Sequence, residues 1–387
     1  MAVVKDSSPL QAPPDAIHLW APAFEGFGGG ITAFSQELAV AVKALHGAPM
    51  LFGKLDLNRT WENLPLWGAG SYPEQFRTAG FAAGVVLAAL RHQPTCILST
   101  HLNFGPVAHF LKRFRGIPYT LVAHGIDVHS GLSPSRLKAL QNADQIIAVS
   151  EWTRQRVLEL GGMDESSVRV LPNTYDDSRF VVGGRPENLV RRYHLDDGEK
   201  VILTVARLDQ GEGYKGYDRI LQALPAIRES SGRVRYLIAG RGDDRPRLET
   251  MARDLGVSAA VTFTGFVPDE ELPDHYRLAD VFAMPSTGEG FGIVFLEAMG
   301  CGTPVLGGNR DGSVDALNGG KLGLLVDPTS VDAIAGGLIS LLKRQGPAPW
   351  FNRVLLSKAV KAVYGRESFR RRVELLPGLK NAAGKIT

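Results

Sequence analysis

A glycine-rich turn between two apolar segments holds the residues of this sequence best suited to bind a phosphorylated ligand. The apolar run VFAMPS predicts a buried strand, and the turn after it, from Gly288 to Gly292, opens a helix in the sequence STGEGFGIVFLEAMG. Backbone N–H groups at a helix start bind phosphate oxygens, and glycine lets the ligand approach them closely. The segment therefore predicts a diphosphate site.

Two glutamates accompany this turn. Glu289 precedes the helix and Glu297 lies within it, with seven residues between them. A carboxylate can accept hydrogen bonds from two vicinal hydroxyls, so the pair suits one acid on a sugar and one on a ribose. The neighbours of Glu297 are nearly all apolar, so we expect this carboxylate to have a partner rather than to be a solvated surface group.

Two cations occur in the segment VARLDQGEGYKGYDRIL. Arg207 ends a predicted strand, and Lys215 lies in the loop before the next helix. Cations that converge on a leaving diphosphate neutralise the negative charge that grows as a glycosidic bond breaks. Arg207 and Lys215 therefore indicate a phosphate-binding loop, with a surface lysine that has no binding role as the alternative.

Together these motifs resemble the signature of the retaining family 4 glycosyltransferases. The matching string is P-S-x-x-E-G-F-G-x-x-x-L-E-A-M-x-x-G-x-P-V. The resemblance implies that Glu289 contacts the donor sugar and that Glu297 holds the nucleotide ribose. It also implies that backbone amides of Phe291 and Gly292 face the phosphates, with Gly290 beside them in the donor site.

The same resemblance assigns two further motifs in this half of the chain. Arg207, Lys215 and Gly216 match the family's diphosphate clamp, although the seven residues between the two cations form a longer loop than many members have. Arg241 and Gly242, in AGRGDDRPRLE, match a G-x-G stretch near the nucleotide base.

The glycine-rich segment EGFGGGITAF, residues 25–34, is a poor dinucleotide fingerprint. Ile31 stands where G-x-G-x-x-G needs its third glycine, and no acid ends a second strand about 20 residues on. The resembling family has a G-G loop here, against the donor phosphate and the acceptor, and Gly29 and Gly30 match it. A tight turn without a binding role is the alternative.

A histidine follows the predicted strand YTLVAH. His124 matches a family histidine near the hydroxyls of the donor sugar. Asp127 and His129 are weaker candidates, since either could instead cap the next segment.

Short apolar runs alternate with helical patterns along the whole chain, which is typical of parallel α/β sheets. We expect strands at residues 16–22, 50–53, 96–100, 119–124 and 145–150, and again at 201–207, 234–240, 261–266, 281–286, 303–308 and 322–327. This pattern predicts two Rossmann-like, doubly wound domains that face a cleft, the GT-B fold, with ligand sites at the carboxyl ends of strands.

The 387 residues suffice for two such domains. A polar stretch separates the two series of strands and predicts a linker over 181–199. We expect an acceptor-side domain over 1–180, flexible over about 1–15, and a nucleotide-sugar-binding domain over 200–365. By resemblance, the C-terminal helix and tail, 366–387, cross back to the N-terminal domain.

Composition excludes several other classes. Hydrophobic residues make up 44% and charged residues 21%, which is typical of a globular protein and not of a disordered one. The two cysteines, Cys96 and Cys301, give no disulfide framework and predict two buried thiols. No D-x-D, H-E-x-x-H or Cys/His cluster occurs, so we expect no metal and no cofactor beyond the substrate.

The N-terminus lacks the apolar core of a signal peptide. The longest apolar run, residues 79–90, is shorter than the roughly 20 residues that span a bilayer, and it predicts a buried helix. A cytoplasmic location is therefore expected, with the inner face of the membrane as a second possibility. From Lys343 onward, eleven Lys and Arg face two Glu, which describes either a solvated face or a surface that attracts anionic lipid.

The sequence thus predicts a retaining hexosyltransferase. Its partners would be a nucleotide-diphosphate sugar and the hydroxyl of an acceptor glycan or lipid-linked sugar, in polysaccharide, glycolipid or lipid-linked oligosaccharide synthesis, and not a nucleic acid. Two alternatives stay open: another sugar-nucleotide enzyme of this fold, such as an epimerase or a phosphorylase, and an inactive transferase fold that only binds its ligands.

Overall fold

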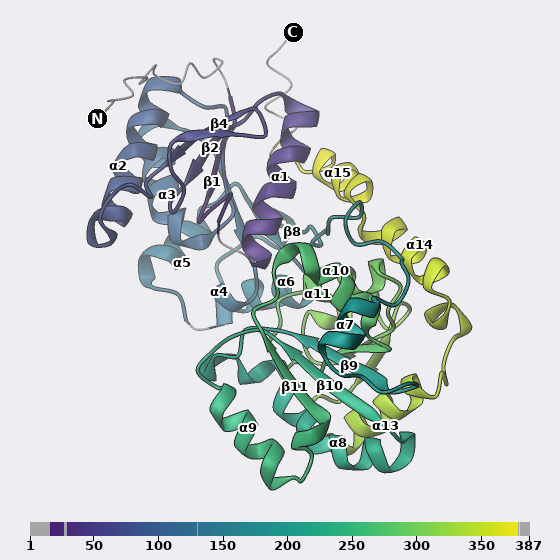
Figure 1. The fold of residues 1–387 in the computed structure, drawn as a ribbon. Coiled ribbons are helices and arrows are strands. Elements are labelled where there is room, and N and C mark those ends of the chain that lie inside the picture. Colours follow the sequence, from purple (N-terminus) through teal and green to yellow (C-terminus); the bar gives the residue numbers. More distant parts are fainter. Residues whose placement is uncertain (1–15, 27–28, 130, 378, 380–387) are drawn as a thin grey trace, which may run out of the picture. The chain divides into compact units, whose positions relative to one another are not determined.

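The computed structural model describes residues 16–26, 29–129, 131–377 and 379, which form two compact α/β units (Figure 1). The first unit comprises residues 1–148, 154–171 and 370–387, and the second comprises 149–153 and 172–369, as far as they are described. The segment expected to be flexible, about 1–15, lies outside the described residues, as does 380–387 at the end of the tail.

The first unit is built on an eight-stranded sheet in the order β3-β4-β2-β1-β5-β6-β7-β8. Every neighbouring pair is parallel except β3 with β4. The strands are β1 (His18–Ala21), β2 (Met50–Gly53), β3 (Arg59–Trp61), β4 (Leu64–Gly68), β5 (Ile97–Ser99), β6 (Tyr119–Ala123), β7 (Gln145–Ala148) and β8 (Val168–Val170).

Helices connect these strands. They are α1 (Gly30–His46), α2 (Glu74–His92), η1 (Leu102–Phe104), α3 (Gly105–Arg115), α4 (Ile126–His129), α5 (Pro134–Gln141), α6 (Glu151–Glu159), whose first turn is counted with the second unit, and η2 (Glu165–Ser167). The helix predicted at 79–90 is part of α2, but only one stripe of it is buried, formed by Phe81, Val85 and Ala89. No helix in the described part of the chain is long and apolar enough to cross a bilayer.

The second unit is built on a six-stranded, all-parallel sheet in the order β11-β10-β9-β12-β13-β14. Its strands are β9 (Lys200–Val205), β10 (Val234–Ala239), β11 (Val261–Gly265), β12 (Val281–Met284), β13 (Val305–Gly308) and β14 (Leu324–Val326). The strands β12 and β13 are fully buried, whereas β11 at the edge of the sheet is only partly buried. Each strand predicted from the sequence is present in one of the two sheets. The strands β3, β4 and β8 were not predicted.

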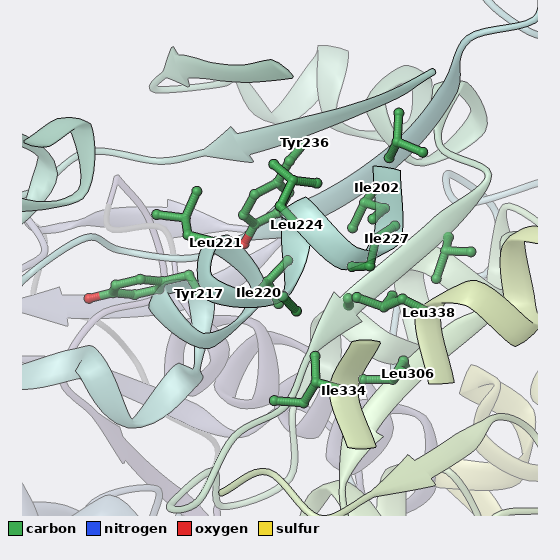
Figure 2. Close-up of a cluster of buried hydrophobic side chains, with 14 of the residues drawn as sticks. Ile202, Tyr217, Ile220, Leu221, Leu224, Ile227, Tyr236, Leu306, Ile334 and Leu338 are labelled. Atoms are coloured by element: carbon green, nitrogen blue, oxygen red, sulfur yellow. The ribbon is translucent and has the colours of Figure 1, made fainter. Parts of the chain in front are cut away.

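The helices of the second unit complete its core. They are α7 (Glu187–Arg192), η3 (Gln210–Lys215), α8 (Tyr217–Ser231), α9 (Arg245–Asp254), η4 (Ser258–Ala260), η5 (Asp269–Glu271), α10 (Leu272–Leu278), α11 (Ile293–Gly300), α12 (Ser313–Ala316), α13 (Val331–Leu342), η6 (Ala348–Phe351) and α14 (Arg353–Tyr364). Figure 2 shows Leu224 of α8 and Leu338 of α13 among the buried side chains that pack with Ile202 of β9.

The boundaries of the two units can be set beside the expected domains. The chain leaves the first unit after Leu171, and the stretch expected as a linker, 181–199, contains α7 and belongs to the second unit. The last helix, α15 (Arg366–Glu374), begins in the second unit, and the residues from Arg370 onward are counted with the first. Both cysteines are free and buried, as predicted.

Candidate active site

The strand order of the second unit reverses beside β9, and this reversal places the predicted motifs. From β9 the chain continues outward to β10 and β11, and then returns to β12 on the other side of β9. In open α/β sheets, ligands bind at the carboxyl ends of the strands where the order reverses. The loop after β9 carries Arg207 and Lys215, and the loop after β12 carries Glu289. Residues far apart in the sequence are therefore brought together.

The two predicted cations share one carboxylate. Arg207 Nη2 forms an ion pair with Glu212 Oε1, and Lys215 Nζ lies 2.8 Å from Glu212 Oε2. The side chain of Arg207 is 70% exposed, whereas those of Lys215 and Glu212 are 14% and 9% exposed. Sequence reasoning did not single out Glu212, although it lies between the two cations in the unusually long loop.

The loop of the cations and the loop of the glutamates are joined through their backbones. The N–H of Thr287 donates to the carbonyl of Tyr214 at 2.9 Å. Gly216 has a φ of +77°, and a Cβ there would lie 2.3 Å from the carbonyl oxygen of Pro285. Only glycine meets both conditions, so the glycine after Lys215 allows the two loops to approach.

Glu289 is held by a second carboxylate that the sequence did not reveal. The backbone N–H of Glu289 donates to Asp311 Oδ2 at 2.7 Å, and that of Ser313 donates to Asp311 Oδ1 at 3.0 Å. Burial raises the pKa of Asp311. Burial also raises the pKa of Glu289, an effect that nearby Lys215 opposes and that Asp311 adds to.

The glycine turn has the shape expected of a helix start. Gly292, with a φ of +90°, precedes α11. The backbone N–H of Phe291 opposes the rise that burial causes in the pKa of Glu289, and the Phe291 side chain is buried. Gly290 packs closely, because a Cβ on Gly312 would lie 2.1 Å from its carbonyl oxygen.

Glu297 has the partner that its apolar neighbours predicted. The hydroxyl of Tyr276, in α10, donates to Glu297 Oε2 at 2.7 Å. Burial raises the pKa of Glu297 to about 7, although the Tyr276 hydrogen bond and the charge of Arg179 both oppose this rise. The carboxyl group can therefore change its ionisation near neutral pH.

The G-x-G stretch lies next to the loop of the cations. Backbone N–H of Leu208 donates to the carbonyl of Arg241 at 2.8 Å, and a Cβ on Gly242 would lie 2.1 Å from the Leu208 carbonyl. The Arg241 guanidinium is 5.3 Å from the ring centroid of Phe266, which is 59% exposed. An exposed aromatic ring beside a planar cation offers a surface on which a nucleotide base can stack.

In the first unit the strand order reverses at β1, which lies between β2 and β5. Gly29, with a φ of +145°, precedes α1, and Gly30 is its first residue; both are exposed. The buried carboxylate of Asp56 accepts a hydrogen bond from the N–H of Phe24 at 2.8 Å and so fixes the start of this loop. Residues 27 and 28 of the loop lie outside the described part.

His124 follows β6 in the first unit and is buried. Its Nε2 is 2.9 Å from the carbonyl oxygen of Thr100, and the Phe34 ring packs edge-to-face against it. Burial, together with a neighbouring histidine, lowers the pKa of His124 to about 3, so the imidazole is neutral at physiological pH. Asp127 Oδ1 accepts a hydrogen bond from the His124 N–H, which is the capping role given as its alternative. The side chain of His129 is outside the described part.

Among the described residues, no group of three or more His, Cys, Asp or Glu side chains could hold a metal ion.

Comparison with known proteins assigns the chain to a family. Residues 187–352 match the model of glycosyl transferases group 1, and residues 29–179 match that of Glycosyltransferase Family 4. An uncharacterized glycosyltransferase of Methanocaldococcus jannaschii is 32% identical over 272 residues, which cover 67% of this chain and 68% of that protein. The chain therefore belongs to the family of glycosyltransferases that these two models and this relative represent.

One curated relative has a defined donor in its name. The GDP-mannose-dependent alpha-(1-6)-phosphatidylinositol monomannoside mannosyltransferase of Mycolicibacterium smegmatis is 37% identical over 250 residues. The match covers 62% of this chain and 63% of that protein, so the chain spans a little under two thirds of this relative's length.

Solved structures confirm the predicted fold class. Sucrose-phosphate synthase from Thermosynechococcus elongatus matches with a TM-score of 0.78 and 22% identity, over 95% of this chain and 100% of that one. HepE of Anabaena, in complex with UDP and glucose, matches with a TM-score of 0.74 and 18% identity, over 92% and 98%. The fold is that of GT-B glycosyltransferases.

Proposed function

We propose that the chain transfers a hexosyl unit from a nucleotide-diphosphate sugar to an acceptor hydroxyl, with retention of the anomeric configuration. The observation that carries this proposal is the convergence of Arg207, Lys215 and Glu289 where the strand order of the second sheet reverses. Two cations beside a carboxylate suit a ligand that joins a diphosphate to a hydroxyl-rich sugar.

Each residue then has a role in the transfer. Arg207 and Lys215 bind the diphosphate and stabilise the charge that it gains as the bond to the sugar breaks. Glu289 accepts hydrogen bonds from the sugar hydroxyls, and Glu297 from the ribose. The acceptor hydroxyl attacks the anomeric carbon from the face that the diphosphate leaves, and its proton goes to the departing phosphate oxygen. The cation pair makes a metal unnecessary, so neither metal nor cofactor enters the proposal.

The remaining residues orient the donor. Arg241 and Phe266 form a surface for the base, next to the phosphate loop. The exposed start of α1, at Gly29 and Gly30, offers backbone N–H groups to a phosphate or to the acceptor. His124 is neutral and contributes a hydrogen bond to a sugar hydroxyl rather than a proton.

The names of the relatives suggest the first substrates to try. The Mycolicibacterium smegmatis relative is named for GDP-mannose and a phosphatidylinositol monomannoside, so we infer that GDP-mannose is the donor and that the acceptor is a glycolipid. Acceptors of polysaccharide synthesis and of lipid-linked oligosaccharide synthesis are the alternatives. A lipid acceptor would place the enzyme on the inner face of the membrane.

The test is turnover of defined donors by the purified protein. GDP-mannose, UDP-glucose, UDP-galactose and UDP-N-acetylglucosamine are each supplied with acceptor lipids, and release of the nucleoside diphosphate is measured with and without a chelator. We expect one donor to be consumed in an acceptor-dependent manner, with no loss on chelation. NMR of the product gives the anomeric configuration, and an inverted product would contradict the retaining mechanism.

The same assay separates the alternatives. An epimerase would convert the sugar without an acceptor. A phosphorylase that depends on pyridoxal phosphate would absorb in the near ultraviolet. A protein that only binds would show a donor-dependent rise in melting temperature but no turnover, since a ligand at 100 times its dissociation constant adds about 2.7 kcal/mol of stability.

Attraction to the membrane is a separate part of the proposal. In α15, Arg370 and Arg371 are exposed, whereas Arg372 is partly buried and Arg366 pairs with Asp176. We expect Arg370→Glu combined with Arg371→Glu to reduce co-sedimentation with anionic vesicles at low salt, and high salt to have the same effect, because such attraction is screened over about 8 Å at physiological ionic strength. Equal binding by the variant would contradict this role.

A further inference from the structure

The loop between the two clamp cations contains an acid that contacts both of them. Glu212 forms ion pairs with Arg207 through Oε1 and with Lys215 through Oε2. Its own position is fixed, because its N–H donates to the carbonyl of Asp209 at 2.8 Å within η3 and its side chain is 9% exposed. One nearly buried carboxylate therefore sets the place of both cationic groups.

Two like charges do not stay close together without such a partner. Arg207 is 70% exposed and has no other ion pair among the described residues, so without Glu212 its long side chain would move into solvent, away from Lys215. Lys215 is mostly buried and also lies near Glu289, where it opposes the rise that burial causes in the pKa of that carboxyl group. Without Glu212, Lys215 would be drawn toward Glu289.

We propose that Glu212 is a positioning residue that holds Arg207 and Lys215 together as one preformed diphosphate clamp. This inference rests on the proposed function, in which the two cations bind the diphosphate of the donor. Glu212 has no contact with the reacting atoms in this assignment. It holds the two cations at a separation set by its two carboxylate oxygens, which is close to the separation of neighbouring phosphate oxygens. The side chains of the cations therefore lose less conformational freedom when the donor binds.

The opposite role is also testable, since a carboxylate on the two cations could compete with the diphosphate. A positioning residue strengthens diphosphate binding, whereas a competitor weakens it. Glu212→Gln separates the two roles because it keeps the size of the side chain but removes its charge, and its amide nitrogen must face one of the cations.

The experiment compares the affinities of GDP and GMP, or of UDP and UMP if the wild type binds those instead, by calorimetry. For Glu212→Gln we expect the dissociation constant of the diphosphate to rise about tenfold. Loss of a residue that orients a metal ligand weakens metal binding by a similar factor. The dissociation constant of the monophosphate should stay within about twofold of the wild-type value. We also expect kcat to fall by up to about 100-fold, since the clamp is then misplaced. Glu212→Asp should restore part of the loss.

Glu199→Gln is the matched control. Glu199 forms a nearly buried ion pair with Arg235 at 3.1 Å in the same unit, next to the amino end of β9, and should affect melting temperature without affecting diphosphate affinity. In a protein that already carries Arg207→Ala and Lys215→Ala, Glu212→Gln should have no further effect on diphosphate affinity, because the groups that it positions are gone.

Each other outcome overturns a distinct statement. Tighter diphosphate binding by Glu212→Gln would make Glu212 a competitor. Equal weakening of diphosphate and monophosphate, with a lower melting temperature, would make its role purely structural. If Lys215→Ala weakens diphosphate binding but Glu212→Gln does not, only this inference fails. If the wild type binds neither diphosphate, the proposed function fails as well.

Discussion

The two units place different chemistry where their strand orders reverse. In the second unit, charged side chains gather after β9 and β12, with Arg207 and Lys215 against Glu212, and with Asp311 under Glu289. The first unit presents the start of α1 and a neutral imidazole, His124. The groups with proposed binding roles are thus charged side chains in the second unit, the charged half-site, and backbone N–H groups with an uncharged imidazole in the first, the neutral half-site.

This difference suggests a division of work. In the proposed function the diphosphate is bound by fixed positive charge, which Arg207 and Lys215 would supply from positions held by their partners. A sugar or an acceptor hydroxyl needs hydrogen bonds without a strong field, which backbone amides and a neutral histidine can provide. Substitution of the charged binding residues of the second unit should therefore change affinity for the nucleotide, and substitution of His124 in the first unit should not.

The largest expected effect comes from removing a clamp cation. Arg207→Ala and Lys215→Ala should each raise the barrier by about 2–4 kcal/mol, a loss of about 30- to 1000-fold in kcat, because each stabilises charge on the leaving diphosphate. The double variant should lose less than the sum of the two, since both cations serve one group. Steady-state kinetics measure this.

The control for that prediction is Arg233→Ala. Arg233 belongs to the same unit, is 71% exposed and pairs only with exposed Asp196 among the described residues, so it should leave kcat unchanged. Unchanged activity in the Arg207 variant would remove this residue from the mechanism and weaken the contrast between the two units.

The two glutamates of the charged half-site should separate in their kinetics. Glu289→Ala should lower kcat by about 10- to 150-fold, because a hydrogen bond to a charged group contributes about 1.5–3 kcal/mol and this one tightens as the sugar reacts. Glu297→Ala should instead weaken donor binding, since the ribose is held equally before and during the reaction. Equal effects of both changes on the donor dissociation constant and on kcat would contradict this assignment.

A substitution in the neutral half-site gives a smaller effect of a different kind. His124→Asn should lower kcat by up to about tenfold, the contribution of one neutral hydrogen bond, and leave the affinity for the free nucleoside diphosphate unchanged. Because burial lowers the pKa of His124 to about 3, the wild-type profile should show no ionisation from this residue between pH 5 and 9. A change in nucleotide affinity in His124→Asn would contradict the assignment of nucleotide binding to the charged half-site.

Much of this arrangement could be predicted from the sequence. The strands of a parallel sheet are apolar runs, and the phosphate motifs lie at their carboxyl ends, so both sheets and the positions of Arg207 and Glu289 follow from local patterns. Two of the unpredicted strands, β3 and β4, lack such a pattern. The three-residue β3 is mostly exposed and pairs antiparallel with β4, which contains Pro65, so neither forms a simple apolar run.

The partners of the site residues could not be predicted in the same way. Asp311 lies 22 residues from Glu289, and Tyr276 lies 21 residues from Glu297. Neither contact leaves a periodic pattern, because each depends on how separate loops and helices meet in the folded sheet. Glu212 is only three residues from Lys215, but its link to Arg207 depends on the η3 turn.

The smallest expected effect is a pH dependence within the charged half-site. Burial raises the pKa of Glu297 from 4.5 to about 7, so this group ionises between pH 6 and 8. If the ionised form accepts hydrogen bonds from both ribose hydroxyls, affinity for the nucleoside diphosphate should rise a few-fold as the pH passes 7. Calorimetry at several pH values measures this, and Glu297→Gln should abolish the dependence.

The free energy of unfolding should fall as the pH rises, whereas the affinity for the nucleoside diphosphate should rise. A carboxyl group whose pKa is higher in the folded than in the unfolded protein contributes stability that is complete below about pH 4.5 and is lost as the pH rises through about 7. The Glu297→Gln side chain cannot ionise, so the melting temperature of this variant relative to the wild type should be higher at pH 8 than at pH 5.

Tyr276→Phe removes the hydrogen bond that favours the carboxylate form of Glu297, so it should move the midpoint of the pH-dependent affinity above pH 7. A midpoint that stays in place would show that Tyr276 does not control this ionisation.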